Sequence, residues 1–302
     1  MEKQIKQTKF NGRTFKKYGF VVSMLIIPII SWLVFWLYSN IDMILLAFKD
    51  VSGHFTTQNF VSFWNELTAP GGEIGISLRN TFLYFGLNIL LVLPLSTLVA
   101  YFIFKKIFAH KVIRVLIFLP SIVPGIVMVT AFKEFIKPWG PLASFGIDIP
   151  SSGWLADPKT ATATIMFYCL WTGLSSGMLL MNGAMTRIPS EIFEAAKLDG
   201  CGAFKEFVSI VIPLIMPTLS MQALFAASGI LVSSGPILLM TGGAYETSTL
   251  SYWIFISTYK GAGGGTNAYN VVSATGLILT LVTFPIVMSV KKIGEKLGEV
   301  EY

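Results

Sequence analysis

The residues best suited to chemistry in this chain are a short run of acidic and small side chains set between two long apolar stretches. The run is Glu194-Ala195-Ala196-Lys197-Leu198-Asp199-Gly200, and Gly202 follows it. Carboxylates form charge-assisted hydrogen bonds with basic groups. Alanine favours helix and adds little bulk, so a helix that carries it can lie close to another surface. The chemistry that this pattern predicts is docking to a partner, with no bond made or broken.

The remaining reactive residues are too few and too scattered for catalysis. His54 and His110 are far apart in the sequence, and Cys169 and Cys201 fall at different predicted membrane depths. Neither a metal site nor a structural disulfide is therefore expected. The chain has no Gly-x-x-x-x-Gly-Lys-Ser/Thr loop, so we do not expect it to hydrolyse ATP itself. We expect no catalytic residue, no metal and no cofactor bound by this chain.

The composition indicates a membrane protein. The 302 residues are 54% hydrophobic and 13% charged, with a mean hydropathy of +0.69, whereas soluble domains carry about 25% charged residues. Six apolar runs without Asp, Glu, Lys or Arg are long enough to cross about 30 Å of hydrocarbon as helices. The sequence therefore predicts an all-α polytopic membrane protein with six transmembrane helices, at 19–41, 80–104, 115–132, 160–185, 207–233 and 268–290.

The distribution of lysine and arginine predicts which side each loop faces, because cytoplasmic loops are enriched in both. Most of the 22 basic residues fall in the N-terminal segment 1–18, in the loops at 105–114 and 187–205, and in the C-terminal segment 291–302. We therefore expect both termini in the cytoplasm. The run 19–41 is too long for the apolar core of a cleaved signal peptide, so a retained first helix is expected. The net charge of +6 follows this topology and indicates no nucleic-acid partner.

Two pairs of prolines are expected to bend helices. Pro120 and Pro124 lie four residues apart in the third run, and Pro213 and Pro217 do so in the fifth. Proline has no N–H to donate and kinks a helix, and residues four apart lie on one helical face. We expect these bends to enclose a cavity and to let helices rock about it.

These motifs and their spacing resemble a known family of transport proteins. Glu194-Ala195-Ala196, with Asp199-Gly200 and the downstream prolines, resembles the coupling motif of ABC importer permeases. The Asp-Gly form is similar to that of the maltose-type and glycerol-phosphate-type branch. Ala244-Tyr245 departs from the Gly-Pro that is usual after Thr-Gly-Gly in that branch. Other resembling segments between Asn80 and Val290 are Phe118-Leu119-Pro120-Ser121-Ile122-Val123-Pro124, Gly140-Pro141-Leu142, Trp171-Thr172-Gly173, Ile188-Pro189 and Leu239-Met240-Thr241-Gly242-Gly243.

The resemblance implies a type I ABC importer permease fold, with a core at 76–290 and a coupling helix at 189–204. It implies a subunit that imports a sugar or oligosaccharide across the bacterial cytoplasmic membrane by alternating access. The implied partners are a second homologous permease, a cytoplasmic ATPase dimer that binds ATP and Mg, an extracytoplasmic solute-binding protein and the membrane lipid. The residues implied in docking to the ATPase are Glu194, Ala195, Ala196, Asp199, Gly200 and Gly202.

Substrate contacts are less well defined by the sequence. The polar and aromatic candidates within the predicted helices are Asn88, Tyr168, Trp171, Asn182 and Gln222. Such side chains orient ligands in binding sites, and they also serve in helix packing. An importer permease for amino acids, peptides or polyamines is the alternative. A secondary transporter fits less well, because no ionisable residue lies within the predicted helices.

Cysteine labelling tests the predicted sidedness. In a chain without its two native cysteines, a cysteine at Ser190 is expected to resist an impermeant maleimide in intact cells and to react in opened membranes, because the 187–205 loop is predicted to be cytoplasmic. A cysteine at Ser151, in the predicted outer segment 133–159, is the control that should react in intact cells. Efficient labelling at 190 in intact cells would reverse the topology.

Overall fold

The computed structural model of the chain describes residues 12–232, 235–261 and 266–298. Over these residues the chain is helical and has no β-sheet, which confirms the predicted all-α class. At 1–11 and 299–302 the predictions for the terminal segments lie outside the described residues, and so does the last residue of the predicted run 207–233. The helices are α1 (Gly12–Ser31), α2 (Ser39–Ala47), α3 (Gln58–Thr68), α4 (Glu73–Leu87), α5 (Leu93–Phe104), α6 (His110–Ile122), α7 (Gly125–Phe135), α8 (Pro141–Ser144), α9 (Ala161–Met185), α10 (Ser190–Leu198), α11 (Ala203–Glu206), α12 (Ile212–Ser228), α13 (Ile237–Met240), α14 (Leu250–Gly261) and α15 (Thr266–Gly298).

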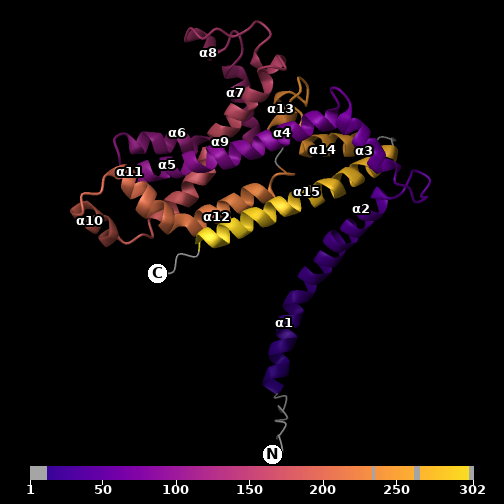
Figure 1. The fold of residues 1–302 in the computed structure, drawn as a ribbon, viewed down its shortest axis with the longest axis horizontal. Helices are drawn as coiled ribbons and strands as arrows, with labels where there is room; N and C mark the ends of the chain where they lie inside the picture. Colours follow the sequence, from indigo (N-terminus) through magenta and orange to yellow (C-terminus); the bar gives the residue numbers. More distant parts are fainter. Residues whose placement is uncertain (1–11, 233–234, 262–265, 299–302) are drawn as a thin grey trace, which may run out of the picture.

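Five helical stretches of the described chain are long and apolar enough to cross a membrane. They match five of the six predicted runs and extend further at several ends. α4, α5, α9, α12 and α15 lie together in one bundle, whereas α1 projects away from it (Figure 1). The five stretches are Gly19–Ala47, Glu73–Phe104, Ala161–Met185, Ala203–Ser228 and Tyr269–Leu297.

The remaining predicted run, the third, does not form one straight helix. The expected single helix at 115–132 is wrong, because α6 and α7 meet at an angle of 114°. Val123 between them is extended, with φ −82° and ψ 137°. Proline disfavours the helical conformation of the residue before it, so Pro124 ends α6 at this point. The predicted bend at this proline pair is confirmed, and it is a full break.

The second proline pair acts differently. Pro213 and Pro217 both lie within α12, and the span Ala203–Ser228 is not broken. The turn that precedes Pro213, at Phe207–Val211, is a wider π-helix, and a similar turn at Asn88–Val92 precedes Pro94. Proline lacks the N–H that would donate to a carbonyl of the preceding turn. Widening that turn allows the helix to continue past the proline.

Small residues allow the main helices of the bundle to pack closely. Gly173 and Gly177 lie four apart on α9 and face α5. A Cβ added at Gly177 would lie 2.5 Å from Ser96 Oγ, and one at Gly173 would lie 3.0 Å from Val92 Cγ1. Such small residues are the usual contact between membrane helices, because they let backbones approach. α5 and α9 therefore pack at a separation that larger side chains would prevent.

The loop at 241–249 is fixed to the start of α4 by buried side chains. Asn80 has no exposed surface, and its Nδ2 donates to the carbonyl oxygens of Glu246 at 2.7 Å and Ser248 at 2.8 Å. The backbone N–H of Leu250 donates to Thr81 Oγ1 at 3.0 Å. These bonds pair backbone groups of an irregular segment, which has no regular ladder of its own to satisfy them.

The same loop adopts a conformation that requires its glycines. Gly243 has φ +79°, and a Cβ there would lie 2.3 Å from the ring of Tyr252. The Tyr252 hydroxyl donates to the carbonyl of Gly242 at 2.7 Å. Burial raises the pKa of Tyr252, and the charge of Glu73 adds to this, so the phenol keeps the proton that it donates.

The replacement of the usual Gly-Pro by Ala244-Tyr245 is accompanied by an unusual backbone conformation in this loop. Tyr245 has φ +57°, in the left-handed region. Proline locks φ near −65°, so the proline that is usual at this place in the resembling family could not adopt this conformation. The loop is therefore shaped differently here from one with the usual Gly-Pro.

The role of Asn80 can be tested by comparison with Asn88. Asn80→Ala removes two hydrogen bonds to loop carbonyls and is expected to cost about 1–3 kcal/mol, lowering the unfolding temperature of the purified protein. Asn88 donates to the carbonyl of Tyr84 one turn earlier in its own helical stretch. Asn88→Ala should therefore have the smaller effect in the same thermal unfolding measurement, and an equal loss in both variants would contradict the proposed anchoring of the loop.

Candidate functional site

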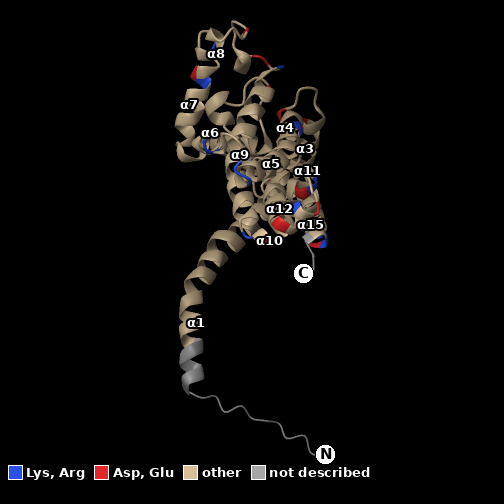
Figure 2. Cartoon of the chain, turned by 90° about the vertical axis from the view of Figure 1, so that its left-hand side faces the viewer, with Lys and Arg blue, Asp and Glu red and all other residues tan. Residues whose placement is uncertain are grey.

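The predicted docking element is a short helix between two membrane spans. α9 ends at Met185, α10 runs from Ser190 to Leu198, and α11 starts the next span at Ala203. α10 lies at one end of the bundle, beyond α5 and α12 (Figure 1). Charged residues of both signs gather at this end, around α10, α11 and the end of α15 (Figure 2). The charge pattern fits an end of the bundle that faces water.

Gly200 ends α10 in the way that the sequence predicts. Its φ is +72°, which L-residues with a Cβ rarely adopt. The N–H of Cys201 donates to the carbonyl of Ala196 at 2.9 Å, and the N–H of Gly200 donates to that of Lys197 at 3.1 Å. This pair of bonds is a Schellman motif, which satisfies carbonyls at the helix end through the backbone alone. Gly202 has an ordinary φ of −73° and does not require glycine for its conformation.

The two alanines of the motif differ in exposure, since Ala195 is exposed and Ala196 is buried. Ala196 is 6% exposed and Phe193 is 8% exposed, so both pack on the chain itself. The expectation that Ala195 and Ala196 together form the surface offered to a partner therefore needs correction. The exposed face carries Glu191, Glu194, Ala195 and Leu198, which follow one another at the helical spacing i, i+3, i+4 and i+7.

Two large apolar side chains at this end were missed by the sequence reasoning. Leu198 is 90% exposed, and Phe204 in α11 is 81% exposed. Leu198 and Phe204 lie in the turns on either side of Gly200, and this position in the sequence could have indicated that they are exposed. Exposed apolar residues rimmed by polar ones mark interaction surfaces. The face that this end offers is an acidic helix flanked by two apolar side chains.

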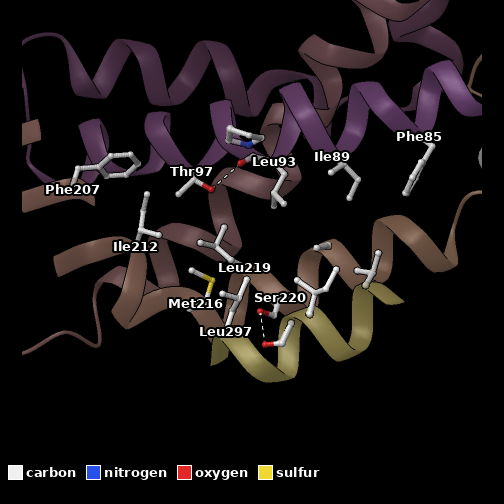
Figure 3. Close-up of a pocket in the computed structure, with 15 residues that line it drawn as sticks. Phe85, Ile89, Leu93, Thr97, Phe207, Ile212, Met216, Leu219, Ser220 and Leu297 are labelled. Atoms are coloured by element: carbon white, nitrogen blue, oxygen red, sulfur yellow. Dashed lines mark hydrogen bonds between the residues drawn. The ribbon is translucent and has the colours of Figure 1, made fainter. Parts of the chain in front are cut away.

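A cavity of about 450 Å³ lies between α4–α5 on one side and α12–α15 on the other. Figure 3 shows apolar side chains from both sides pointing into it, among them Phe85, Ile89 and Met216. The hydroxyl of Thr97 donates to the carbonyl of Leu93 at 2.8 Å, and that of Ser220 donates to Gly294 at 3.2 Å. Since both hydroxyl protons are already used, the cavity offers a sugar little hydrogen bonding.

The structure places the five predicted substrate contacts in different surroundings, and two of them, Tyr168 and Trp171, are in contact. Tyr168 is 5% exposed and packs against Phe132, with ring centres 5.0 Å apart. Trp171 lines a second cavity, of about 660 Å³, near α6 and α7. Asn88, Asn182 and Gln222 are half-buried, and none of the five lines the cavity of Figure 3. Their part in substrate binding stays a prediction.

Comparisons with known proteins point to one family. The model of the family described as "Binding-protein-dependent transport system inner membrane component" matches residues 92–297. The multiple sugar-binding transport system permease MsmF of Streptococcus mutans is 25% identical and covers 86% of this chain and 90% of its own. The lactose transport permease LacF of Rhizobium radiobacter is 26% identical and covers 85% of each chain. The maltose/maltodextrin permease MalF of Salmonella typhimurium is 27% identical over 76% of this chain, which spans about half of MalF.

Solved structures show the same fold. A chain of a bacterial ABC transporter for the acidic polysaccharide alginate, in complex with a pentasaccharide-bound periplasmic protein, superposes with a TM-score of 0.79 at 21% identity. The superposition covers 96% of this chain and 99% of the other.

Gly200 and Gly202 form a matched pair for testing the end of α10. Both are exposed, with open space where a Cβ would be, and only Gly200 has a positive φ. Gly200→Val is expected to destabilise the turn by about 1–2 kcal/mol, since valine resists the left-handed region. Trypsin cleavage at Lys197 and Lys205 in membranes should therefore become about tenfold faster. Gly202→Val should cleave at the wild-type rate, and equal rates in the two variants would show that the turn does not depend on Gly200.

Proposed function

Because this chain belongs to the family of binding-protein-dependent transport system inner membrane components, we propose that it is the permease subunit of an ATP-driven importer for a sugar or oligosaccharide. The matched relatives support the sugar class, since they are named for multiple sugars, lactose and maltodextrins. Other branches of importer, for amino acids, peptides or polyamines, have less support from these relatives.

α10 is the feature that carries the coupling role. Its exposed face offers Glu194 for an ion pair, Ala195 for close approach and Leu198 for an apolar pocket. A partner that fits this face has a groove with a basic residue at one side and an apolar recess at its end. Asp199, Gly200 and Gly202 end the helix and set its direction, and Ala196 seats it on the bundle. A cytoplasmic ATPase dimer that binds ATP and Mg is the partner we propose.

The proposed topology counts the broken pair α6–α7 as one crossing, which gives six. Both termini then lie on the cytoplasmic side with α10, in the bacterial cytoplasmic membrane. The C-terminal end of α15 supports this, because it lies near the end of the bundle that carries α10 (Figure 1). The outer loops that include α3, α8 and α14 would face the solute-binding protein.

Import would then follow a shift between two populated states. ATP binding closes the ATPase pair, α10 moves with it, and the helices rearrange between inward-open and outward-open forms. A second homologous permease completes the path, and we propose that it supplies much of the hydrogen bonding that the apolar cavity of this chain lacks. Trp171 and the half-buried Asn88, Asn182 and Gln222 are the contributions proposed from this chain, with Tyr168 supporting Trp171 at a ring-centre distance of 6.3 Å.

Reconstituted transport tests the proposal. The complex purified with the ATPase and permease encoded beside this gene is expected to take up labelled oligosaccharides into liposomes when ATP and the binding protein are supplied. A protonophore should not reduce uptake, since the described spans hold no ionisable residue near their centres. Uptake that stops with the protonophore would favour a secondary transporter, and uptake of amino acids or polyamines would move the chain to another branch.

Ala195 and Ala196 provide the matched variants for the coupling role. Ala195→Trp adds bulk to the exposed face and should abolish co-purification of the ATPase while the unfolding temperature stays unchanged. Ala196→Trp overfills a buried position and should lower the unfolding temperature, with a cost of about 1–3 kcal/mol. Full ATPase binding by Ala195→Trp would remove α10 as the docking element.

A further inference from the structure

A buried carboxylate lies behind the docking helix. Glu206, the last residue of α11, is 3% exposed and is the one charged residue that is buried in the part of the chain that the structure describes. Burying a carboxylate costs much free energy unless it is paired and hydrogen-bonded. Apolar packing alone therefore cannot account for a carboxylate at this position, which requires groups that pair with it.

Two residues at the end of α5 satisfy this carboxylate. The ammonium of Lys105, which directly follows α5, forms an ion pair with Glu206 Oε1. The Tyr101 hydroxyl lies 2.9 Å from the same oxygen and 3.1 Å from the carbonyl of Ala203. Tyr101 also packs on Phe207, with ring centres 4.9 Å apart. The end of α5 is thereby tied to the start of the next span, about a hundred residues later in the chain.

The same ammonium also holds α10. Lys105 Nζ lies 4.4 Å from the ring centre of Phe193, a cation–π contact. The Phe193 ring lies 5.4 Å from that of Phe104 in α5. Because Phe193 is one of the two buried residues of α10, the helix is seated on α5 largely through this side chain. Lys105 thus contacts both the docking helix and Glu206.

We propose that Lys105, Glu206 and Tyr101 form a charged joint that makes α10 move as one body with α5 and with the span that starts at α11. Lys105 and Glu206 are then positioning residues for the coupling of ATP hydrolysis to import, an inference that rests on the proposed function. The physical reason is that an ion pair and apolar packing respond differently when the two surfaces are displaced. Apolar contacts let surfaces slide, whereas Glu206 cannot leave Lys105 without remaining buried and unpaired, so a displacement of α10 is passed to both spans.

A role in stability alone is the competing explanation, and a double apolar variant separates the two. Lys105→Met/Glu206→Met removes both charges and keeps much of the side-chain volume, and replacing a whole buried pair is often neutral for stability. In the reconstituted complex we expect near wild-type thermal unfolding, ATPase binding and ATP hydrolysis. Sugar molecules imported per ATP should fall about tenfold, which is a typical size for coupling between sites.

Two further variants complete the test. Glu206→Gln keeps the shape and one acceptor oxygen but removes the charge. It should also lower import per ATP, and it provides the test if the double variant is unstable. Lys106→Met removes one charge at the neighbouring exposed position and should leave import per ATP unchanged. Wild-type import per ATP in both the double variant and Glu206→Gln would overturn the joint. A wild-type complex without ATP-driven import would instead overturn the importer assignment, and the joint with it.

Discussion

Pairing backbone polar groups away from water is the constraint on which the rest of this structure depends. A chain in hydrocarbon has no solvent to bond to its N–H and C=O groups, so its spans must be helices. The structure departs from the regular helix where proline removes a donor. Near Pro94 and Pro213 a wider turn takes up the change and the span continues. At Pro124 the helix ends, and α7 starts again in a new direction.

The same requirement is met differently at the two ends of the bundle. The loop at 241–249 depends on tertiary contacts, because Asn80 and Thr81 in α4 bond to backbone groups of the loop and of Leu250 after it. In the turn after α10, backbone N–H groups of the turn itself donate to the carbonyls at the helix end, in the Schellman motif around Gly200. An element closed by its own backbone keeps its shape when it moves. α10 is therefore suited to transmit motion, and the loop at 241–249 is suited to stay fixed to α4.

Much of the fold could be predicted from the sequence, since composition and run length determine the spans. The left-handed end at Gly200 was also predictable, because an Asp-Gly pair after a short helix is a local signal. The break at Pro124 was expected only as a bend, since its size depends on the packing of α6 against α5 and α9. The burial of Ala196 could also have been predicted, because Ala196 follows Phe193 by three residues and therefore lies on the same face of the helix.

The rest depends on contacts between distant parts of the chain. Lys105 and Glu206 looked like ordinary loop charges, and nothing near either residue in the sequence indicates the other. Which cavities the five polar and aromatic residues proposed for a substrate path line depends on the rotation of each helix about its axis. The sequence alone does not determine that rotation when a helix is apolar on all sides.

The close contacts of Gly173 and Gly177 with α5 have a consequence for how the bundle deforms. Because the side chains of Val92 and Ser96 lie directly against these glycines, rotation of α9 against α5 would drive other atoms of α9 into them. Gly294 and Ser220 limit α15 and α12 in the same way, since a Cβ on Gly294 would lie 2.9 Å from Ser220 Cβ. The bundle thus consists of two stiff pairs of helices with an apolar seam between them. Because Lys105 and Glu206 tie α5 to the start of the span that contains α12, relative displacement of the two pairs is expected to pivot about that end.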